Sequence, residues 1–430
     1  MKLNRKIATP FKGDTAIWVI FLILSIISLV AVYSSIGLSA ITSASTPHRA
    51  LMKHGVFVLL SWVAVIVIAN MNYRKLASLS VLGYIISIGL LVAVMFFGGS
   101  DAGSGTGRWL VLPGNIRFQP SELAKVVMVV YLARLLAVEK ERLKEWPTFR
   151  NICLLTLLVV GLILPENLST AAILFVTCFV TMRFTHVDAR MWNRTVLALI
   201  AIGIVAILIS SHRSSNSGPL ARSETWTSRV DHWMHPDPDV LNQENMARMA
   251  VASGGLWGVG VGNTVHARLM TQAHNDFIYA IIIEEMGAFV AIIIFLLYAM
   301  LYFCCIRLVW KCKGTFGQLC VAGLGTLIFL QAAIHMGVSV GAFPVTGQTL
   351  PFISAGGSAY LCMALALGVI QAVAADVNRN ERKAKERKAA ATAAGNGDAK
   401  EESVVEESVV EDLSVEAAEP SMVNDNNISE

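Results

Sequence analysis

Charged residues are scarce in this sequence: they make up 15% of its 430 residues, whereas hydrophobic residues make up 55%, and the mean hydropathy is +0.61. Soluble proteins carry about 25% charged residues, so this composition excludes a soluble globular enzyme. Cysteine is absent from the expected outer loops, where a disulfide could form. None of the seven cysteines falls in an expected outer loop and none forms a CxxC pattern. An external disulfide framework and a thiolate metal site are therefore excluded.

The apolar residues are grouped in ten blocks, and a helix needs roughly 20 such residues to cross a bilayer. The blocks are 16–38, 55–70, 79–97, 120–138, 151–165, 168–184, 195–211, 276–306, 317–340 and 355–375. We therefore expect an all-α integral membrane protein with about ten transmembrane helices.

The positions of Lys and Arg predict the orientation of these helices, because cytoplasmic loops carry the excess of positive charge. With the N-terminus inside, 24 of the 34 Lys and Arg residues fall in inner segments, nine fall in outer segments, and Lys125 lies within a span. Both termini are therefore expected to be cytoplasmic. The segment 212–275, between helices 7 and 8, becomes one long extracytoplasmic loop.

Composition divides the chain into three parts. Residues 1–15 form a basic cytoplasmic tail, and residues 16–378 form one polytopic membrane domain that includes the large outer loop. Residues 379–430 begin with a basic run and continue with an acidic stretch, so this tail is expected to be disordered in the cytoplasm. No nucleic-acid partner is expected. The glycine-rich stretch 254–262 follows no strand, so it gives no phosphate-loop signal and is expected to let a loop helix dip onto the membrane surface.

The first candidate motif is the segment 118–125, which reads Phe-Gln-Pro-Ser-Glu-Leu-Ala-Lys. Pro120 suits the first turn of a helix, and Glu122 and Lys125 are three residues apart and so share a face. A charge at this depth is costly unless it is paired or hydrated. Two interpretations stay open: a structural pair that pins the helix end, or a cation that binds an anionic substrate.

The second motif is His-Asn-Asp-Phe-Ile-Tyr-Ala at 274–280, at the start of the eighth span. Asp276 is either the N-cap of this helix or a general base beside an aqueous cavity, and the residue spacing does not favour one over the other. Glu284 and Glu285 lie about two turns deeper. One of them is expected to pair with an inward-facing cation such as Lys125 or Arg194.

The third motif is the segment 343–358, where two prolines and three glycines predict irregular backbone at membrane depth. Such backbone persists in a membrane only where it lines a cavity or is packed in protein. It is expected to form a re-entrant wall of a site, and a plain loop before a glycine-rich helix start is the alternative.

Together these motifs resemble the SEDS family of bacterial cell-wall polymerases, which includes FtsW, RodA and SpoVE, over residues 16–375. The resemblance rests on Arg-Trp-Leu at 108–110 with Gln-Pro-Ser-Glu-Leu-Ala-Lys at 119–125, and on Gln243 followed by Gly-Gly-Leu-Trp-Gly-Val-Gly at 254–260. It also rests on the 274–280 motif with Glu-Glu-Met-Gly at 284–287, and on Leu-Pro-Phe-Ile-Ser-Ala-Gly-Gly-Ser at 350–358.

The resemblance implies an inverting peptidoglycan glycosyltransferase that polymerises lipid II into β-1,4 glycan strands at the outer face of the bacterial inner membrane. It implies Asp276 as the catalytic base, with Lys125 and the outer-loop arginines facing the diphosphate. The implied substrate-binding residues are Arg108, Gln119, Glu122, Lys125, Arg222, Arg229, Gln243, His274 and Ser354. No protein metal ligand and no tightly bound cofactor are implied, although Mg²⁺ or Mn²⁺ would suit the phosphates.

The resemblance also implies partners: a class B penicillin-binding protein, which is a transpeptidase, and membrane proteins of the divisome or the elongasome. The long inner tail and the particular residues of the motifs favour the division branch, which FtsW represents. The alternative functions are a lipid II flippase or other lipid-linked transporter, and a scaffold that only recruits partners.

Four positions depart from the family pattern, one of which is Asn275, where the family usually has a Thr before the key Asp. Glu166 and Ser169 replace the Asp and the Gly of its Pro-Asp-Leu-Gly-Thr-Ala segment, and Ala355 replaces an aromatic residue.

Overall fold

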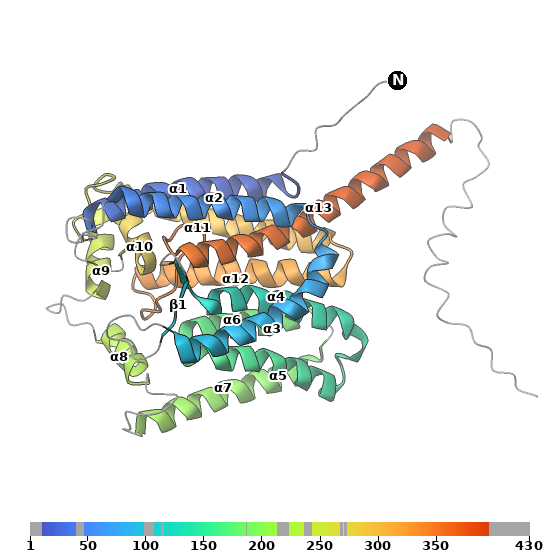
Figure 1. The fold of residues 1–430 in the computed structure, drawn as a ribbon, viewed down its shortest axis with the longest axis horizontal. Coiled ribbons are helices and arrows are strands. Elements are labelled where there is room, and N and C mark those ends of the chain that lie inside the picture. The colour runs from blue at the N-terminus through green and yellow to red at the C-terminus, as the bar shows by residue number, and fades with distance from the viewer. Residues whose placement is uncertain are drawn as a thin grey trace, which may run out of the picture. The chain divides into compact units, whose positions relative to one another are not determined.

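The computed structural model describes residues 11–39, 47–98, 107–112, 116–185, 187–212, 223–235, 243–266, 270 and 273–394 (Figure 1). Each of the ten apolar blocks coincides with a helix. These helices are α1 (Thr15–Ser39), α2 (Pro47–Asn70), α3 (Tyr73–Phe97), α4 (Pro120–Val138), α5 (Trp146–Ile163), α6 (Leu168–Arg183), α7 (Ala189–His212), α11 (Ile278–Lys311), α12 (Thr315–Ser339) and α13 (Gly357–Ala394). The prediction of an all-α membrane fold is confirmed.

Seven of the described helices are long and apolar enough to cross a membrane: α1, α2, α3, α5, α11, α12 and α13. Helix α6 is a shorter apolar helix, and α4 carries Glu122, Lys125 and Arg134 within its length. The remaining elements are short. They are the strands β1 (Leu110–Leu112) and β2 (Ile116–Phe118), the 3-10 turn η1 (Lys140–Arg142), and the helices α8 (Ser223–Met234), α9 (Gln243–Gly254) and α10 (Ala273–Asp276).

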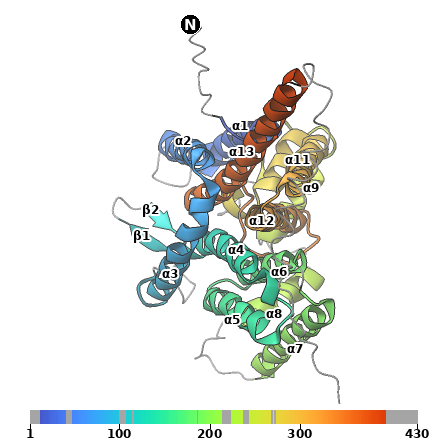
Figure 2. The same cartoon turned by 90° about the vertical axis from the view of Figure 1, so that its right-hand side faces the viewer.

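The chain divides into two units, Met1–Val377 and Asn378–Glu430, and the fold below is that of the first. Within it, α12 is the central helix, in contact with α11, α4, α6 and α9 (Figure 2). Glycines on α12 permit this close packing, because a side chain at Gly323 would meet Val129 and Thr181 at under 3 Å. Small residues serve the same purpose at other membrane helix interfaces. The tail predicted to be disordered is residues 379–430, but its described part, up to Ala394, is helical and belongs to α13; residues 395–430 lie outside the described part of the chain.

Helix α11 is broken at Gly287, whose φ of 82° and ψ of 168° are not helical. The loop that follows α9 supplies the backbone hydrogen bonds that the break removes. Val259 N donates to the Glu284 carbonyl at 2.9 Å and Gly260 N donates to the Glu285 carbonyl at 3.0 Å. In the other direction, Ala288 N donates to the Gly255 carbonyl at 3.0 Å. A broken helix is tolerated in a membrane protein when its free groups are satisfied in this way.

Glycine is needed on both sides of this contact. A side chain at Gly254 would overlap the Ile283 carbonyl, one at Gly258 would overlap the Glu285 carbonyl, and one at Gly287 would overlap the Leu256 carbonyl. The glycine-rich stretch therefore docks on the break in α11. The expectation that these glycines let a loop helix dip onto the membrane surface is replaced by a tertiary role.

Candidate active site

Asp276 ends the short helix α10, and Phe277 interrupts the helix before α11 begins at Ile278. Phe277 occupies the N-cap position of α11, with φ −129° and ψ 21°, and its carbonyl accepts from Ala280 N at 3.0 Å. Asp276 is therefore not the N-cap of α11, which was one of the two interpretations of the motif. Its half-buried carboxylate remains available for another role.

The carboxylate of Asp276 faces two arginines that come from distant parts of the chain. Arg108 and Arg229 both act on its charge, and the Arg108 guanidinium and the Asp276 carboxylate approach the same point beside Gly347. A side chain at Gly347 would lie 3.8 Å from Asp276 Oδ2 and 3.9 Å from Arg108 Nη1. Gly347 thus lies beside both the carboxylate and the guanidinium.

Burial raises the pKa of Asp276 to about 6, although the positive charges of Arg108 and Arg229 act in the opposite direction. A carboxylate with a pKa just below neutrality is mostly ionised at pH 7 and is still basic enough to accept a proton in a reaction. This is the balance that general base catalysis requires.

Two structural elements bring the arginines to this place. Arg108 lies two residues before β1, in the hairpin where Val111 pairs with Arg117, and Arg229 lies on α8. Arg229 Nη1 donates to the Val345 carbonyl at 3.3 Å, and Trp233, one turn later, donates to the Gly341 carbonyl at 2.9 Å. Helix α8 is thus fastened to the segment that precedes Gly347.

The segment between α12 and α13 is irregular, as its prolines and glycines predicted, and it is packed in protein. Leu350, Phe352 and Ile353 are each at most 1% exposed. The Ser354 hydroxyl donates to the Asn275 carbonyl at 2.9 Å and accepts from Leu350 N at 2.7 Å. Ser354 therefore ties this segment to the residue next to Asp276.

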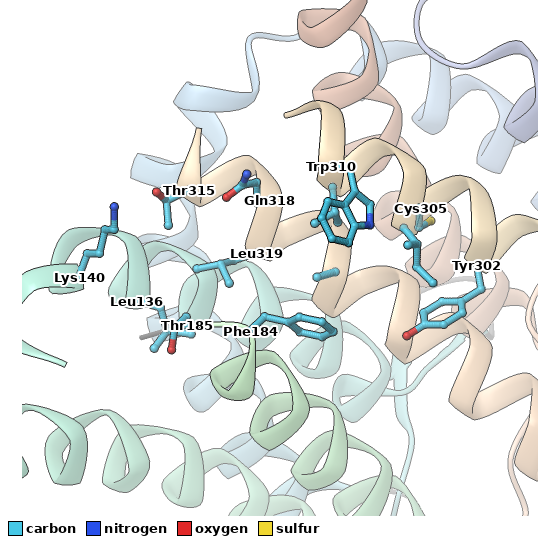
Figure 3. Close-up of a pocket in the computed structure, with 13 residues that line it drawn as sticks. Leu136, Lys140, Phe184, Thr185, Tyr302, Cys305, Trp310, Thr315, Gln318 and Leu319 are labelled. Carbon is cyan, nitrogen blue, oxygen red and sulfur yellow. The ribbon is translucent and has the colours of Figure 1, made fainter. Parts of the chain in front are cut away.

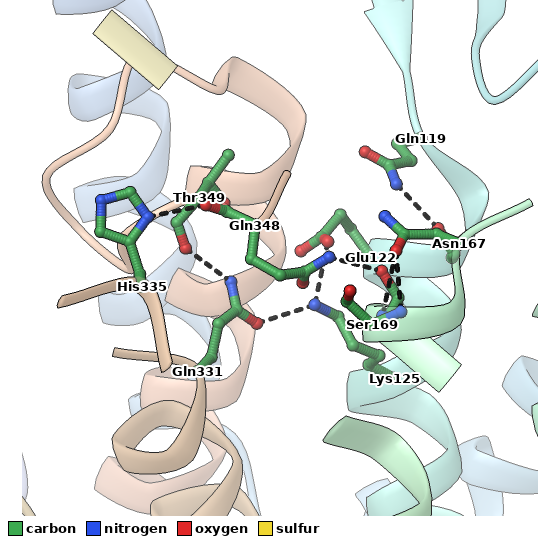
Figure 4. Close-up of polar contacts among 11 residues, drawn as sticks. Gln119, Glu122, Lys125, Asn167, Ser169, Gln331, His335, Gln348 and Thr349 are labelled. Carbon is green, nitrogen blue, oxygen red and sulfur yellow. Dashed lines mark hydrogen bonds and ion pairs between the residues drawn. The ribbon is translucent and has the colours of Figure 1, made fainter. Parts of the chain in front are cut away.

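A buried polar network that includes side chains of α12 holds the segment between α12 and α13 (Figure 4). The Gln348 carbonyl lies 2.7 Å from His335 Nδ1, and the Thr349 carbonyl accepts from Gln331 Nε2 at 2.9 Å. The Gln348 side chain donates to Thr170 Oγ1 on α6 at 2.8 Å. None of these four side chains was identified from the sequence. The available signal was an amide and an imidazole four residues apart on α12, which share a face within an apolar helix.

Lys125 belongs to this network and is fully buried. Its Nζ lies 2.9 Å from Glu122 Oε1 and donates to Gln331 Oε1 at 2.7 Å. Of the two interpretations of this motif, the structure contains the pair that pins the start of α4. Contact between Lys125 or Glu122 and a diphosphate stays a prediction, and it would require this pair to open.

The two deeper acids do not pair with Lys125 or Arg194, so the expectation for them was wrong. Glu284 lies 2.8 Å from His266 Nδ1 and accepts from Val265 N at 3.0 Å, and it also bonds the Thr264 hydroxyl. Glu285 bonds the Ser34 hydroxyl of α1 and accepts from Gly262 N at 3.4 Å. Both carboxylates therefore anchor the loop after α9, and Lys125 already has its partner on α4.

The remaining predicted site residues are distributed around this centre. Gln119 is half-buried at the N-cap of α4 and donates to Ser121 Oγ at 3.0 Å, and half-buried Gln243 begins α9. Arg222 and the side chain of His274 lie outside the described residues. The structure thus brings together Asp276, Arg108 and Arg229.

Fold and site together define a polytopic helical membrane protein that holds a carboxylate and two guanidiniums at one end of its helix bundle. The cell cycle protein family of FtsW, RodA and SpoVE matches residues 14–379, and the chain belongs to this family.

Curated relatives agree with this assignment. The chain is 28% identical over 370 residues to the probable peptidoglycan glycosyltransferase FtsW of Bacillus subtilis (strain 168), covering 83% of this chain and 89% of the relative. It is 33% identical over 336 residues to the protein of the same name from Nitrosococcus halophilus (strain Nc4), covering 75% and 82%.

Solved structures share the fold. A chain from a peptidoglycan synthase complex, described as coordinating polymerization and crosslinking, superposes with a TM-score of 0.67 at 24% identity, covering 85% of this chain and 98% of that chain. The rod shape determining protein RodA of Thermus thermophilus superposes with a TM-score of 0.60 at 22% identity, covering 85% and 97%.

Proposed function

We propose that this chain is a peptidoglycan glycosyltransferase that polymerises lipid II into β-1,4 glycan strands at the outer face of the bacterial inner membrane. The observation that carries the proposal is the placement of the Asp276 carboxylate and the Arg108 guanidinium beside Gly347, with Arg229 acting on the charge of the same carboxylate. Glycosyl transfer from a lipid diphosphate needs a base at the nucleophile and positive charge at the leaving group.

In the proposed reaction, Asp276 accepts the proton of the acceptor's 4-hydroxyl while the hydroxyl oxygen attacks the anomeric carbon of the growing glycan. The bond from that carbon to the diphosphate breaks on the opposite face, so an α-linked donor gives a β-linked product. The electron pair leaves with undecaprenyl diphosphate, whose developing charge Arg108 and Arg229 offset.

The proposal includes a divalent cation only as an ion that binds together with the diphosphate of the substrate. Among the residues that the structure describes, no group of three or more His, Cys, Asp and Glu side chains is placed to hold a metal ion. Mg²⁺ or Mn²⁺ bound with the substrate would take phosphate oxygens among its ligands, as Mg²⁺ does at other phosphate sites. In the proposed reaction, Asp276 accepts the proton of the acceptor without help from the cation.

The proposal extends to topology and partners. Both termini face the cytoplasm, with residues 1–15 and 379–430 as tails of a membrane domain over 16–378. A class B penicillin-binding protein is the proposed partner, because crosslinking must follow polymerisation, and a structural relative comes from a complex that coordinates both steps. The curated relatives carry the division-protein name FtsW, which favours the divisome over the elongasome.

The test is polymerisation of labelled lipid II by the purified protein with its transpeptidase. Asp276→Asn should abolish glycan polymer, whereas Asp231→Asn should leave it intact, because Asp231 is a 75% exposed acid on α8. Normal polymer from Asp276→Asn would disprove the base assignment. Absence of polymer from the wild type, with lipid II translocation in vesicles, would instead establish the transporter alternative.

A further inference from the structure

A cavity lies at the opposite end of the bundle from Asp276. It has a volume of about 490 Å³, and residues from the ends of α4, α6 and α11 and from the beginning of α12 line it (Figure 3). Asp276 lies at the beginning of α11, and α11 ends beside this cavity, so the two sites are a helix length apart. Its size is within the roughly 300–1,000 Å³ range of ligand pockets.

The cavity is amphipathic. Lys140, Thr315 and Gln318 lie together on one side, whereas Tyr302, Cys305 and Trp310 lie on the other (Figure 3). Most of the lining is apolar, and an apolar cavity does not retain ordered water, which needs two to four polar partners. The ligand that suits this lining has a hydrocarbon body and a polar head.

The rim of the cavity has the features of a membrane–water interface. Trp310 is 84% exposed and Phe184 is 58% exposed, and large aromatic side chains of this kind gather at the headgroup level of a bilayer. The cavity is therefore placed where a lipid can enter sideways with its headgroup at the surface.

The charge around this rim is positive. Exposed Lys140 lines the cavity, and three further exposed cations stand within two residues of lining positions. These are Arg183 beside Phe184, Lys311 beside Trp310, and Lys313 before Thr315. Two acids, Glu139 and Glu141, flank Lys140 and offset part of this charge. Basic pockets between transmembrane helices bind anionic headgroups.

We propose that this cavity binds an anionic glycerophospholipid, with one acyl chain among Leu136, Leu319 and Ala322 and the phosphate near Lys140 and Thr315. The site is separate from the polymerisation centre and does not depend on the proposed activity. Anionic lipid at this position would join the ends of α4, α6 and α11 at one bilayer surface.

The test is native mass spectrometry of the full-length protein with dioleoyl phosphatidylglycerol and, separately, dioleoyl phosphatidylethanolamine. The wild type should bind the anionic lipid more tightly. Lys140→Gln should weaken that binding about fivefold, the contribution of one lysine beside an anionic lipid. The matched control is Lys144→Gln, which removes another exposed lysine at this end and should change nothing.

A second variant tests the hydrocarbon part. Ala322→Phe places a ring in the cavity and should reduce binding of both lipids, while an unchanged thermal transition shows that the fold is intact. If this buried replacement does not fold, Lys140→Gln still decides the outcome. Equal binding by the Lys140 and Lys144 variants would overturn the proposal. So would equal affinity of the wild type for the two lipids, or displacement of phosphatidylglycerol by an equimolar isoprenoid phosphate.

Discussion

The buried Lys125–Glu122 pair predicts a specific pattern of stabilities. Lys125→Met leaves the Glu122 carboxylate, which is 3% exposed, without its counter-charge, and it also removes the hydrogen bond to Gln331. Removal of one member of a buried ion pair costs about 3–5 kcal/mol, whereas replacement of both members by uncharged groups is close to neutral. Lys125→Met should therefore be strongly destabilised, and Glu122→Gln/Lys125→Met should recover most of the loss.

The assay is thermal unfolding of the wild type, the two single variants and the double variant in one detergent, combined with lipid II polymerisation by each. A double-mutant cycle isolates the coupling between the two side chains. Strictly additive losses, or a Lys125→Met protein as stable as the wild type, would refute the structural role of the pair. A stable Lys125→Met protein that needs more lipid II for half-maximal rate would restore the diphosphate-binding interpretation.

Four further predictions concern the site and the residues that support it. Because burial raises the pKa of Asp276 to about 6, polymerisation should increase as pH rises through about 6, and a pH-independent rate would contradict the base assignment. The ionised Asp276 carboxylate costs stability only above its ordinary pKa of 3.8, so Asp276→Asn should raise the Tm at pH 7.5 and barely change it at pH 4. Gly254→Ala should cost about 1–3 kcal/mol through overlap with Ile283, whereas Gly161→Ala on α5, which meets no atom within 4 Å, should be neutral or stabilising in the same melts. Ser354→Ala should cost about 1–3 kcal/mol and lower kcat, because Ser354 holds the residue beside Asp276; full activity would show that this link does not position the base.

The helices could be predicted because each needs only its own sequence. A run of apolar residues long enough to cross a bilayer forms a helix wherever the chain places it, since no other backbone satisfies its hydrogen bonds in lipid. The irregular backbone of segment 343–358 was also predictable from its own sequence, because proline and glycine disfavour a continuous helix wherever they occur. The break in α11 at Gly287 was not predictable from the sequence. The backbone groups that complete its hydrogen bonds lie in the loop after α9, and a single glycine does not indicate which distant segment packs against it.

The candidate site was predicted as a set of residues and not as an arrangement. The motif around Asp276 marked a functional position, but the spacing could not separate a cap from a base, since that depends on a single residue of helix register. Gln331 and His335 were overlooked because amides and imidazoles in an apolar helix have no partner that sequence distance reveals. The expected partner of Glu284 was wrong because the histidine that binds it lies in a loop.

The break in α11 also sets an order on the assembly of the membrane domain. Helix α11 cannot complete its backbone hydrogen bonds around Gly287 by itself, because the carbonyls of Glu284 and Glu285 and the amide of Ala288 find their partners in residues 255–260. The chain synthesises that loop before it synthesises α11. When α11 is synthesised, the residues whose backbone groups complete its hydrogen bonds are already on the chain, so residues 255–260 support the folding of the helix that follows them.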